Sequence, residues 1–288
     1  MRATILVTGA NGQLGREIRE LETAFPQFHF VFLSREEMAV HDPVLVRQCF
    51  DTYKPDYCIN CAAYTAVDKA ETETDMAYQV NAEAAGVLAE ICASQNCRFI
   101  HISTDYVFDG QGTRPYLPDD PTGPRSVYGA SKLAGEQQVQ SRNPDAIIIR
   151  TSWVYSGFGK NFVKTMLRLM TEKPEINVVN DQWGSPTYAA DLAAAIMVVV
   201  AGNNWKAGVY HFCNAGAINW HQFATAIRDL AGLSAIVHAI PSSAYPVAAE
   251  RPKYSVLDTR SMAETFAIPM KPWAESLQHC LSRLAKNC

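Results

Sequence analysis

The sequence predicts an α/β fold, in which a doubly wound parallel sheet is joined to a smaller C-terminal lobe. Through about residue 151, short apolar runs alternate with amphipathic segments of helical length. Apolar strands that alternate with helices are typical of a parallel sheet covered on both faces. After residue 152 the alternation loosens, which places much of the remaining chain in a second unit.

The elements of the first part can be assigned in order. The expected strands cover residues 5–8, 29–33, 57–61, 99–103 and 146–151, and the expected helices cover residues 13–22, 43–53, 74–94 and 127–141. The helix over 43–53 has the clearest start. Asp42 is its expected N-cap, and Pro43 lies in the first turn, where a missing N–H costs no hydrogen bond.

The second part has fewer clear elements. Helices are expected over 161–172, 188–200 and 221–231, with a last strand over 208–212. Residues 241–260 are rich in proline, serine and alanine, which predicts a loop region around a binding surface. The lobe is expected to lie over the strand ends, where open α/β sheets bind ligands.

The composition is that of a folded protein rather than a disordered one. Of 288 residues, 48% are hydrophobic and 19% charged, and the net charge of −4 comes without any basic block. A surface for nucleic acid or an anionic membrane is therefore not indicated. No stretch approaches the roughly 20 apolar residues of a membrane span, and the first apolar run is too short for a signal peptide. We expect a cytoplasmic protein.

The chain contains eight cysteines, and Cys58 and Cys61 form its one C-x-x-C sequence. Side chains alternate along a strand, so these two would point to opposite faces and could share neither a metal nor a disulfide. No second pair completes a zinc site. The cysteines are expected to be buried, inert thiols.

A glycine-rich loop follows the first strand and opens the first helix. Its G-x-x-G-x-x-G pattern is formed by Gly9, Gly12 and Gly15. The first glycine permits a tight turn, the second lets backbone N–H groups approach a pyrophosphate, and the third allows close packing of helix on strand. The pattern predicts a Rossmann-type NAD(P)-binding domain, with Gln13 and Leu14 among its cofactor contacts. This domain is expected to comprise residues 1–152 plus about 175–215, and the substrate-binding lobe about 153–174 and 216–288.

The end of the second strand bears on the choice of cofactor. An acid is usual there, where it binds the adenosine ribose, but this strand ends in Ser34 and Arg35. A hydroxyl and a guanidinium suit a 2′-phosphate, which favours NADPH over NADH while leaving NADH open. Alternatively, Arg35 is a surface residue paired with Glu36 and Glu37.

Three side chains suit the reduction of a carbonyl group. Thr104 follows the fourth strand, and Tyr128 and Lys132 are one helical turn apart on the same face. Tyr128 would donate the proton, and a nearby ammonium would lower the phenol pKa. Thr104 would orient the carbonyl. The set, combined with the glycine loop, resembles the extended short-chain dehydrogenase/reductase superfamily.

Within that superfamily the chain resembles the dTDP-4-dehydrorhamnose reductases over nearly its whole length. The stretches that carry this resemblance are C-A-A-Y-T-A-V-D-K-A-E at 61–71, S-T-D-Y-V-F at 103–108, R-T-S-W-V-Y at 150–155, N-D-Q-W-G-S-P-T at 180–187, and R-P at 251–252 followed by L-D-T at 257–259.

The resemblance implies an activity and a set of contacts. The activity is reduction of the C4 keto group of dTDP-4-dehydro-β-L-rhamnose to dTDP-L-rhamnose, within dTDP-rhamnose biosynthesis. Thr104 and Asp105 would meet the sugar, and Trp153 would line its pocket unless it is a core aromatic. The residues implied along the cofactor are Val40 at the adenine, and Ala63, Tyr64 and Thr65 further on.

Two positions depart from the family pattern. Ala39 stands before Val40, where an Asp is frequent. Some members bind Mg²⁺ between subunits through acidic side chains; Glu17, on a first helix expected to be exposed, matches one such position, but Ala190 stands at a second. Mg²⁺ binding is therefore doubtful, and the expected state is a monomer or a weak homodimer.

Two other functions remain open at this point. A nucleotide-sugar epimerase or dehydratase would share the Thr–Tyr–Lys set, although dehydratases need an extra acid–base pair, and Asp105 is followed by Tyr106 rather than Glu. A non-catalytic regulatory subunit, such as the methionine adenosyltransferase β subunit, has similar motifs. The complete catalytic set favours an enzyme.

Overall fold

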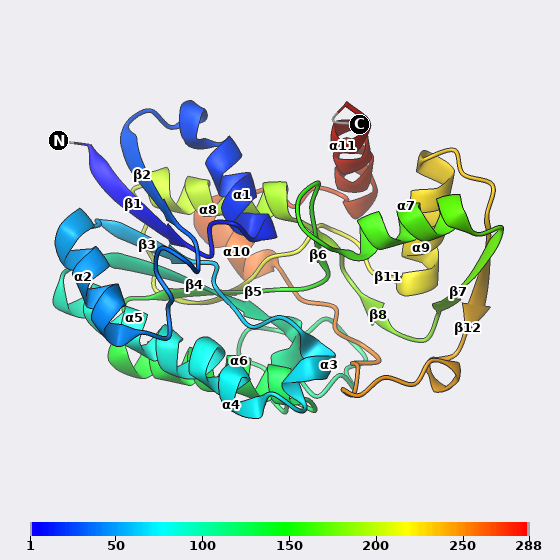
Figure 1. The fold of residues 1–288 in the computed structure, drawn as a ribbon, viewed down its shortest axis with the longest axis horizontal. Helices are drawn as coiled ribbons and strands as arrows, with labels where there is room; N and C mark the ends of the chain where they lie inside the picture. The colour runs from blue at the N-terminus through cyan, green and yellow to red at the C-terminus, as the bar shows by residue number, and fades with distance from the viewer. Residues whose placement is uncertain (1, 287–288) are drawn as a thin grey trace.

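The computed structural model describes residues 2–286 and contains a six-stranded, all-parallel sheet (Figure 1). The strand order is β10-β5-β4-β3-β1-β2. These strands are β1 (Ala3–Thr8), β2 (Phe28–Leu33), β3 (Tyr57–Asn60), β4 (Arg98–Thr104), β5 (Ile147–Thr151) and β10 (Gly208–His211). The chain reverses its direction of winding at β1, so β2 lies on one side and β3 on the other. The predicted doubly wound α/β fold is confirmed.

Helices cover both faces of the sheet (Figure 1). One face packs against α1 (Gln13–Glu20), α8 (Ala189–Ala201) and α10 (Arg260–Phe266). The other packs against α2 (Pro43–Tyr53), α5 (Ala84–Ser94) and α6 (Val127–Arg142). Strand residues alternate between the two cores, as period-two geometry requires. This is why the strands read as continuous apolar runs.

The smaller lobe has a core of its own. A two-stranded parallel sheet pairs β7 (Glu175–Val179) with β12 (Ile236–Ile240), and three helices complete the lobe: α7 (Phe162–Glu172), α9 (Trp220–Leu230) and α11 (Trp273–Lys286). Two short pairings connect the lobe to the rest: β6 (Val154–Tyr155) with β9 (Thr187–Tyr188), and β8 (Trp183–Gly184) with β11 (Ile218–Asn219).

The sheet pairings differ from the domain limits expected from the sequence. The stretch 175–215 was assigned to the cofactor domain, but β7 within it pairs with β12 of the lobe. Conversely, α10 lies in the stretch 216–288 assigned to the lobe, yet it packs on β10 of the large sheet. The chain crosses between the two units more often than apolar periodicity reveals.

The expected elements are present within two residues of their predicted ends, and two of the helices differ in detail. Helix 13–22 ends at Glu20 and continues as a 3-10 turn over Glu22–Ala24. Helix 74–94 is divided into α4 (Thr74–Tyr78), a π-helical turn over Gln79–Glu83, and α5. Short helical turns not expected from the sequence are α3 (Val67–Ala70), Asp105–Val107 and Ser242–Ala244.

The π-helical turn contains Asn81, whose side chain contacts two other segments. The side chain of Asn81 accepts from the Tyr64 N–H at 2.8 Å and donates to the Tyr64 carbonyl at 3.1 Å and to Ser131 Oγ at 3.0 Å. The widened turn therefore fastens the loop after β3 to helix α6. Single π turns of this kind are frequent at functional sites.

The cysteine expectations hold in part. Cys58 and Cys61 do pack into opposite cores of the sheet, as strand alternation predicts. Burial is less complete than expected, because Cys49 and Cys61 are only half-buried. Cys288 lies outside the described residues.

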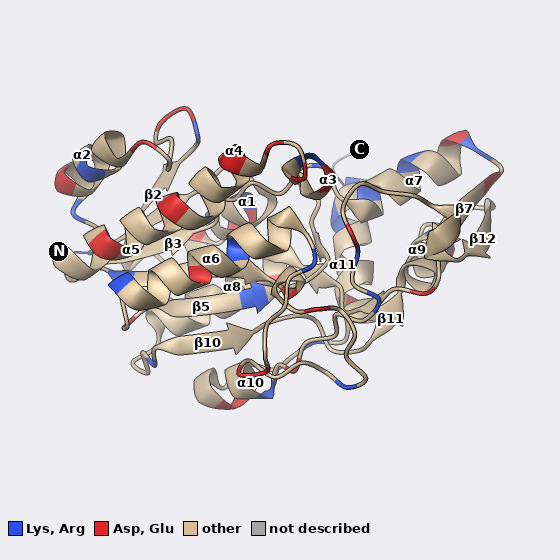
Figure 2. Ribbon diagram, turned by 90° about the horizontal axis from the view of Figure 1, so that it is seen from below, with Lys and Arg blue, Asp and Glu red and all other residues tan. Residues whose placement is uncertain are grey.

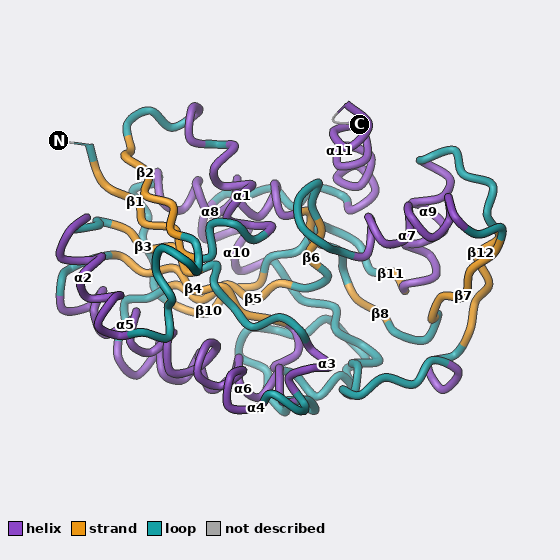
Figure 3. The backbone as a smooth tube through the Cα atoms, viewed as in Figure 1, coloured by secondary structure: helices purple, strands orange, loops and turns teal. Residues whose placement is uncertain are grey.

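Basic and acidic residues are scattered over the helices and loops, as the colouring of the ribbon in Figure 2 shows. Among residues 2–286, none of the helices is long and apolar enough to traverse a lipid bilayer. Figure 3 shows that loops, together with short strands such as β6, lie between the large sheet and the lobe.

Candidate functional site

Two adjoining cavities lie at the carboxyl ends of the sheet strands. The first, about 430 Å³, runs from the glycine loop across the end of β2, and the second, about 520 Å³, runs toward the lobe. They share Gly12, Cys61 and Ala63 as lining residues. Their sizes are typical of small-molecule sites. Their position is that at which doubly wound sheets bind ligands.

The glycine loop has a backbone that other residues could not adopt. Gly9 has φ +62°, and a Cβ there would lie 2.7 Å from the backbone nitrogen of Ala62. A Cβ on Gly15 would lie 2.6 Å from the Gly9 carbonyl oxygen. Helix α1 begins after Gly12 without a side-chain cap, so its first N–H groups and the positive end of its dipole are available to an anion. These features fit a pyrophosphate.

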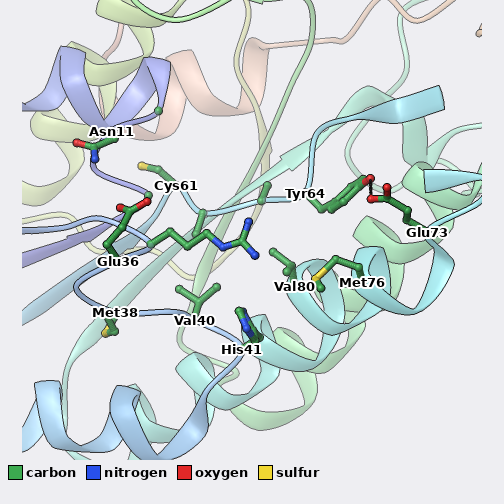
Figure 4. Close-up of a pocket in the computed structure, with 15 residues that line it drawn as sticks. Asn11, Glu36, Met38, Val40, His41, Cys61, Tyr64, Glu73, Met76 and Val80 are labelled. Atoms are coloured by element: carbon green, nitrogen blue, oxygen red, sulfur yellow. Dashed lines mark hydrogen bonds between the residues drawn. The ribbon is translucent and has the colours of Figure 1, made fainter. Parts of the chain in front are cut away.

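The first cavity has a basic and an apolar side. Arg35 and Val40 line it together with Tyr64, Met76 and Val80 from the loop after β3 and the following helix. In Figure 4, Val40 and His41 face Val80 and Met76 across the cavity, and Tyr64 bonds to Glu73 beyond them. An apolar slot beside a guanidinium suits an adenine with a neighbouring phosphate.

Ser34 and Arg35 are in different situations. Ser34 is buried, its N–H donates to Glu37 at 2.8 Å, and its hydroxyl hydrogen bond is the main cause of a lowered Glu36 pKa. The expected open hydroxyl is therefore already engaged. Arg35 is exposed and contributes least to lowering the Glu36 pKa, so its guanidinium is not committed to that carboxylate.

The second cavity brings the predicted catalytic residues together. Thr104, Asp105, Tyr128, Lys132 and Trp153 all line it. It is also lined by the expected cofactor contacts Gly12, Gln13, Leu14, Ala63 and Thr65. Segments more than a hundred residues apart in sequence thus meet around one space, because the strands that precede them are neighbours in the sheet.

Thr104 and Tyr128 are positioned by different means. Thr104 ends β4, where its hydroxyl donates to Asp105 Oδ1 at 3.0 Å and accepts from the Tyr106 N–H at 3.3 Å. Tyr128 lies in the first turn of α6, which Ser126 caps through the Gly129 N–H. The Tyr106 ring packs edge-on against the Tyr128 ring, with centroids 5.4 Å apart.

The electrostatics of the site differ from the expectation in one respect. Burial raises the pKa of Tyr128, and Asp105 and Tyr106 raise it further. A hydrogen bond with Thr104 opposes this rise, and the net direction for the protein groups by themselves is upward. Burial also lowers the pKa of Lys132, to about 8, and raises that of Asp105 to about 6. In this site desolvation outweighs attraction between charges.

Trp153 is both packed against another aromatic residue and exposed to the second cavity. Its ring stacks on Trp220 with centroids 3.5 Å apart, while the residue also lines the second cavity. Its backbone has φ +48°, and Gly184 leaves room for the indole, since a Cβ there would lie 2.6 Å from the ring. A tryptophan held in this way offers a rigid apolar surface to a ligand.

Comparison with known proteins identifies the family. A family model described as the RmlD substrate binding domain matches residues 1–286. The spore coat polysaccharide biosynthesis protein SpsK of Bacillus subtilis is 42% identical, with 99% of each chain covered. The dTDP-4-dehydrorhamnose reductase of Burkholderia thailandensis is also 42% identical, over 97% of this chain and 98% of that one. The chain belongs to the dTDP-4-dehydrorhamnose reductase family.

A solved structure of this family supports the same conclusion. The dTDP-4-dehydrorhamnose reductase of Bacillus anthracis, in complex with NADP, superposes with a TM-score of 0.94 at 37% identity, covering 98% of this chain and 100% of that one. The whole length, lobe included, is therefore organised as in a family reductase.

Glu17 has a different environment from the one expected. It is 1% exposed, and its carboxylate accepts from Ser156 Oγ at 2.6 Å and pairs with Arg283 at 2.9 Å. The expectation of an exposed acid is wrong, because α11 of the lobe packs its arginine against α1. Within residues 2–286 no cluster of three or more His, Cys, Asp or Glu side chains could hold a metal. Both carboxylate oxygens of Glu17 already have partners within the chain, so this side chain is a poor ligand for Mg²⁺.

Several residues at the site were not singled out from the sequence. Arg251, noted only as part of a family stretch, donates to Asp68 at 2.5 Å and lies 3.5 Å from the Tyr106 hydroxyl. It ties the loop 241–260 to the second cavity. Asn81 was hidden inside a predicted helix. No sequence signal distinguishes it from the other polar residues of that helix, such as Gln79 and Glu83.

Proposed function

We propose that the protein reduces the C4 keto group of dTDP-4-dehydro-β-L-rhamnose to dTDP-L-rhamnose, with NADPH as the preferred reductant and NADH as an alternative. The observation that carries this proposal is the meeting of Thr104, Tyr128 and Lys132 in a cavity continuous with the glycine loop. A carbonyl beside Thr104 would lie within one space shared with a dinucleotide. Membership of the reductase family supports the same reaction.

The residues present fit a dinucleotide along both cavities. The uncapped first turn of α1 would hold the pyrophosphate, and Arg35 a 2′-phosphate on the adenosine. Val40 would contact the adenine, and Ala63, Tyr64 and Thr65 would follow the cofactor toward the second cavity. When bound, the nicotinamide supplies the hydride for the carbonyl carbon.

The chain itself supplies orientation and the proton. Thr104 Oγ1 would turn its one proton from Asp105 Oδ1 to the carbonyl oxygen of the substrate and so align it. Because the pKa of Tyr128 is raised by burial, its phenol keeps its proton at neutral pH and can deliver it to that oxygen as the C–H bond forms. The product is an alcohol, and Tyr128 is left as a phenolate that the Lys132 ammonium would stabilise.

A third cavity supports a nucleotide sugar as the substrate. Arg251 and Lys253 line it together with Tyr245 and Tyr254, all in the loop region of the lobe. Two cations suit a diphosphate and the aromatic rings suit a base. Arg251 also contacts Tyr106, which connects this cavity to the catalytic one.

The test is a turnover assay with chemically defined sugars. NADPH oxidation is followed with a panel of 4-keto-6-deoxy nucleotide sugars, and the product stereochemistry is determined by NMR. We expect the fastest turnover with dTDP-4-dehydro-β-L-rhamnose. Faster turnover with another sugar would indicate a different reductase. Tight NADPH binding without turnover of any sugar would favour the regulatory-subunit alternative.

A further inference from the structure

Four buried polar side chains form a continuous hydrogen-bonded chain from β1 to α6. Thr8 Oγ1 donates to Asn60 Oδ1 at 2.6 Å, and Asn60 Nδ2 lies 3.0 Å from His101 Nδ1. His101 Nε2 in turn lies 3.3 Å from Lys132 Nζ. All four residues are at most 2% exposed. The chain ends on the lysine that lines the second cavity.

The orientation of Asn60 determines the tautomer of His101. The Ala62 backbone N–H donates to Asn60 Oδ1 at 3.2 Å, and since an N–H can only donate, the atom that faces it is oxygen. The Asn60 NH₂ group therefore faces His101 Nδ1. It too can only donate, so Nδ1 carries a lone pair and the neutral ring has its proton on Nε2. Burial lowers the pKa of His101 well below its usual value, which keeps the ring neutral.

The imidazole N–H thus points at the Lys132 nitrogen. An ammonium has three donors and no lone pair, whereas an amine can accept this hydrogen while donating to the Ile102 carbonyl at 2.6 Å. Burial, which lowers the Lys132 pKa to about 8, acts in the same direction. The contact with His101 therefore favours the amine.

Other charged and titratable groups near Lys132 could also influence its charge state. Glu136 lies one turn further along α6 and attracts the ammonium, but its carboxylate is held by Arg150 at 2.7 Å. The remaining titratable groups are in the second cavity: Asp105, Tyr106, Tyr128 and Cys61 from the chain segments that line it, and Lys160 from the lobe.

We infer that His101 is a positioning residue for the reduction: held in one tautomer by Asn60, it aims an N–H at Lys132 and favours the uncharged amine over the ammonium. The inference rests on the proposed function insofar as the Lys132 ammonium assists Tyr128. If the ammonium form is the active one, activity falls as Lys132 loses its proton. With His101 in place, this fall should occur at a lower pH than it would for a lysine without that contact.

Asn60→Asp tests the tautomer relay directly. A carboxylate only accepts, so it would favour the tautomer whose proton is on Nδ1, accept a hydrogen bond from that N–H, and leave the Nε2 lone pair facing Lys132. We expect the alkaline limb of each pH profile, that of kcat/KM and that of NADPH affinity, to shift to higher pH by about one pH unit or more. Thr8→Val is the matched control: it removes the hydrogen bonds of the Thr8 hydroxyl with Asn60 and with the Ala62 N–H. The Ala62 N–H still donates to Asn60 Oδ1 and keeps the amide orientation, so the alkaline limbs should not move.

The ring nitrogens give a second readout that does not depend on activity. ¹⁵N NMR of the full chain, with the His101 signals assigned by loss in His101→Gln, should show the Nε2–H tautomer in the unmodified protein and Nδ1–H in Asn60→Asp. If Asn60→Asp does not fold, His101→Leu removes the N–H without adding charge, and the limbs should again move up.

The outcomes separate this inference from the proposed function. An Nδ1–H tautomer in the unmodified protein, or a tautomer change that leaves both limbs unmoved, overturns the role of His101. A chain that turns over no nucleotide sugar, yet shows the stated tautomers and the moved limb of NADPH binding, overturns the reductase instead.

Discussion

The two adjoining cavities that form the site are assembled in different ways. The first is lined only by residues between Gly9 and Val80, which come from the glycine loop and from the segments that follow β2 and β3. The second is lined by residues from Gly12 to Leu192, drawn from the large sheet, α6 and the lobe. Local sequence therefore specifies how the adenosine side is built, while the catalytic side depends on the packing of distant segments.

The largest expected effect is on the catalytic side. Tyr128→Phe keeps the ring and its edge-on contact with Tyr106 but removes the proton donor. We expect turnover to fall by about 10²–10⁴-fold, the usual contribution of a general acid, with the dissociation constant for NADPH unchanged. A loss of less than about tenfold, or ~1.4 kcal/mol of transition-state stabilisation, would remove Tyr128 from the acid role.

The next effect concerns the backbone of the first cavity. Gly15→Ala places a methyl group 2.6 Å from the Gly9 carbonyl oxygen, so the loop must shift. We expect a destabilisation of about 1–3 kcal/mol, as for other overpacked sites, and weaker binding of both dinucleotides. Chemical denaturation and calorimetry measure the two effects.

The matched control for this variant is Gly157→Ala. Its added methyl group meets its nearest neighbour at 3.8 Å, which is ordinary contact. Stability and cofactor binding should change little. Equal effects of the two substitutions would show that the glycine loop is not the constrained element.

A smaller and more selective effect is expected from Arg35→Ala. The exposed guanidinium lines the first cavity, and only NADPH offers it a 2′-phosphate. One charge-assisted hydrogen-bond partner corresponds to about 1.5–3 kcal/mol, so NADPH should bind at least tenfold more weakly and NADH almost unchanged. Isothermal titration with both cofactors measures this, and equal losses would leave Arg35 as a surface residue.

The smallest expected effect is that of removing metal. Glu17 is already paired with Arg283 and accepts from Ser156, so its carboxylate has no need of a cation. We expect unchanged turnover in EDTA and a monomer or weak homodimer by light scattering, with and without the chelator. A dimer that dissociates and loses activity on chelation would show that other ligands hold a metal.

Features that depend on neighbouring residues were predicted from the sequence, and features that depend on distant segments were not. The helix capped by Asp42, the glycine loop and the Tyr128–Lys132 spacing are local features, and the structure contains each of them. The burial of Glu17 and the hydrogen-bonded position of Asn81 were missed, because each depends on a segment at least 17 positions away.

The sequence by itself determined the alternation of strands and helices, the turn at the glycines and the family to which the chain belongs, since these depend on periodicity, backbone sterics and short motifs. Only the tertiary structure decided the direction of the Tyr128 pKa, the burial of Glu17 and the contacts of His101 with Asn60 and Lys132. The physical reason is desolvation. The charge and proton state of a polar group depend on which distant side chains exclude water from it, and no local pattern records them.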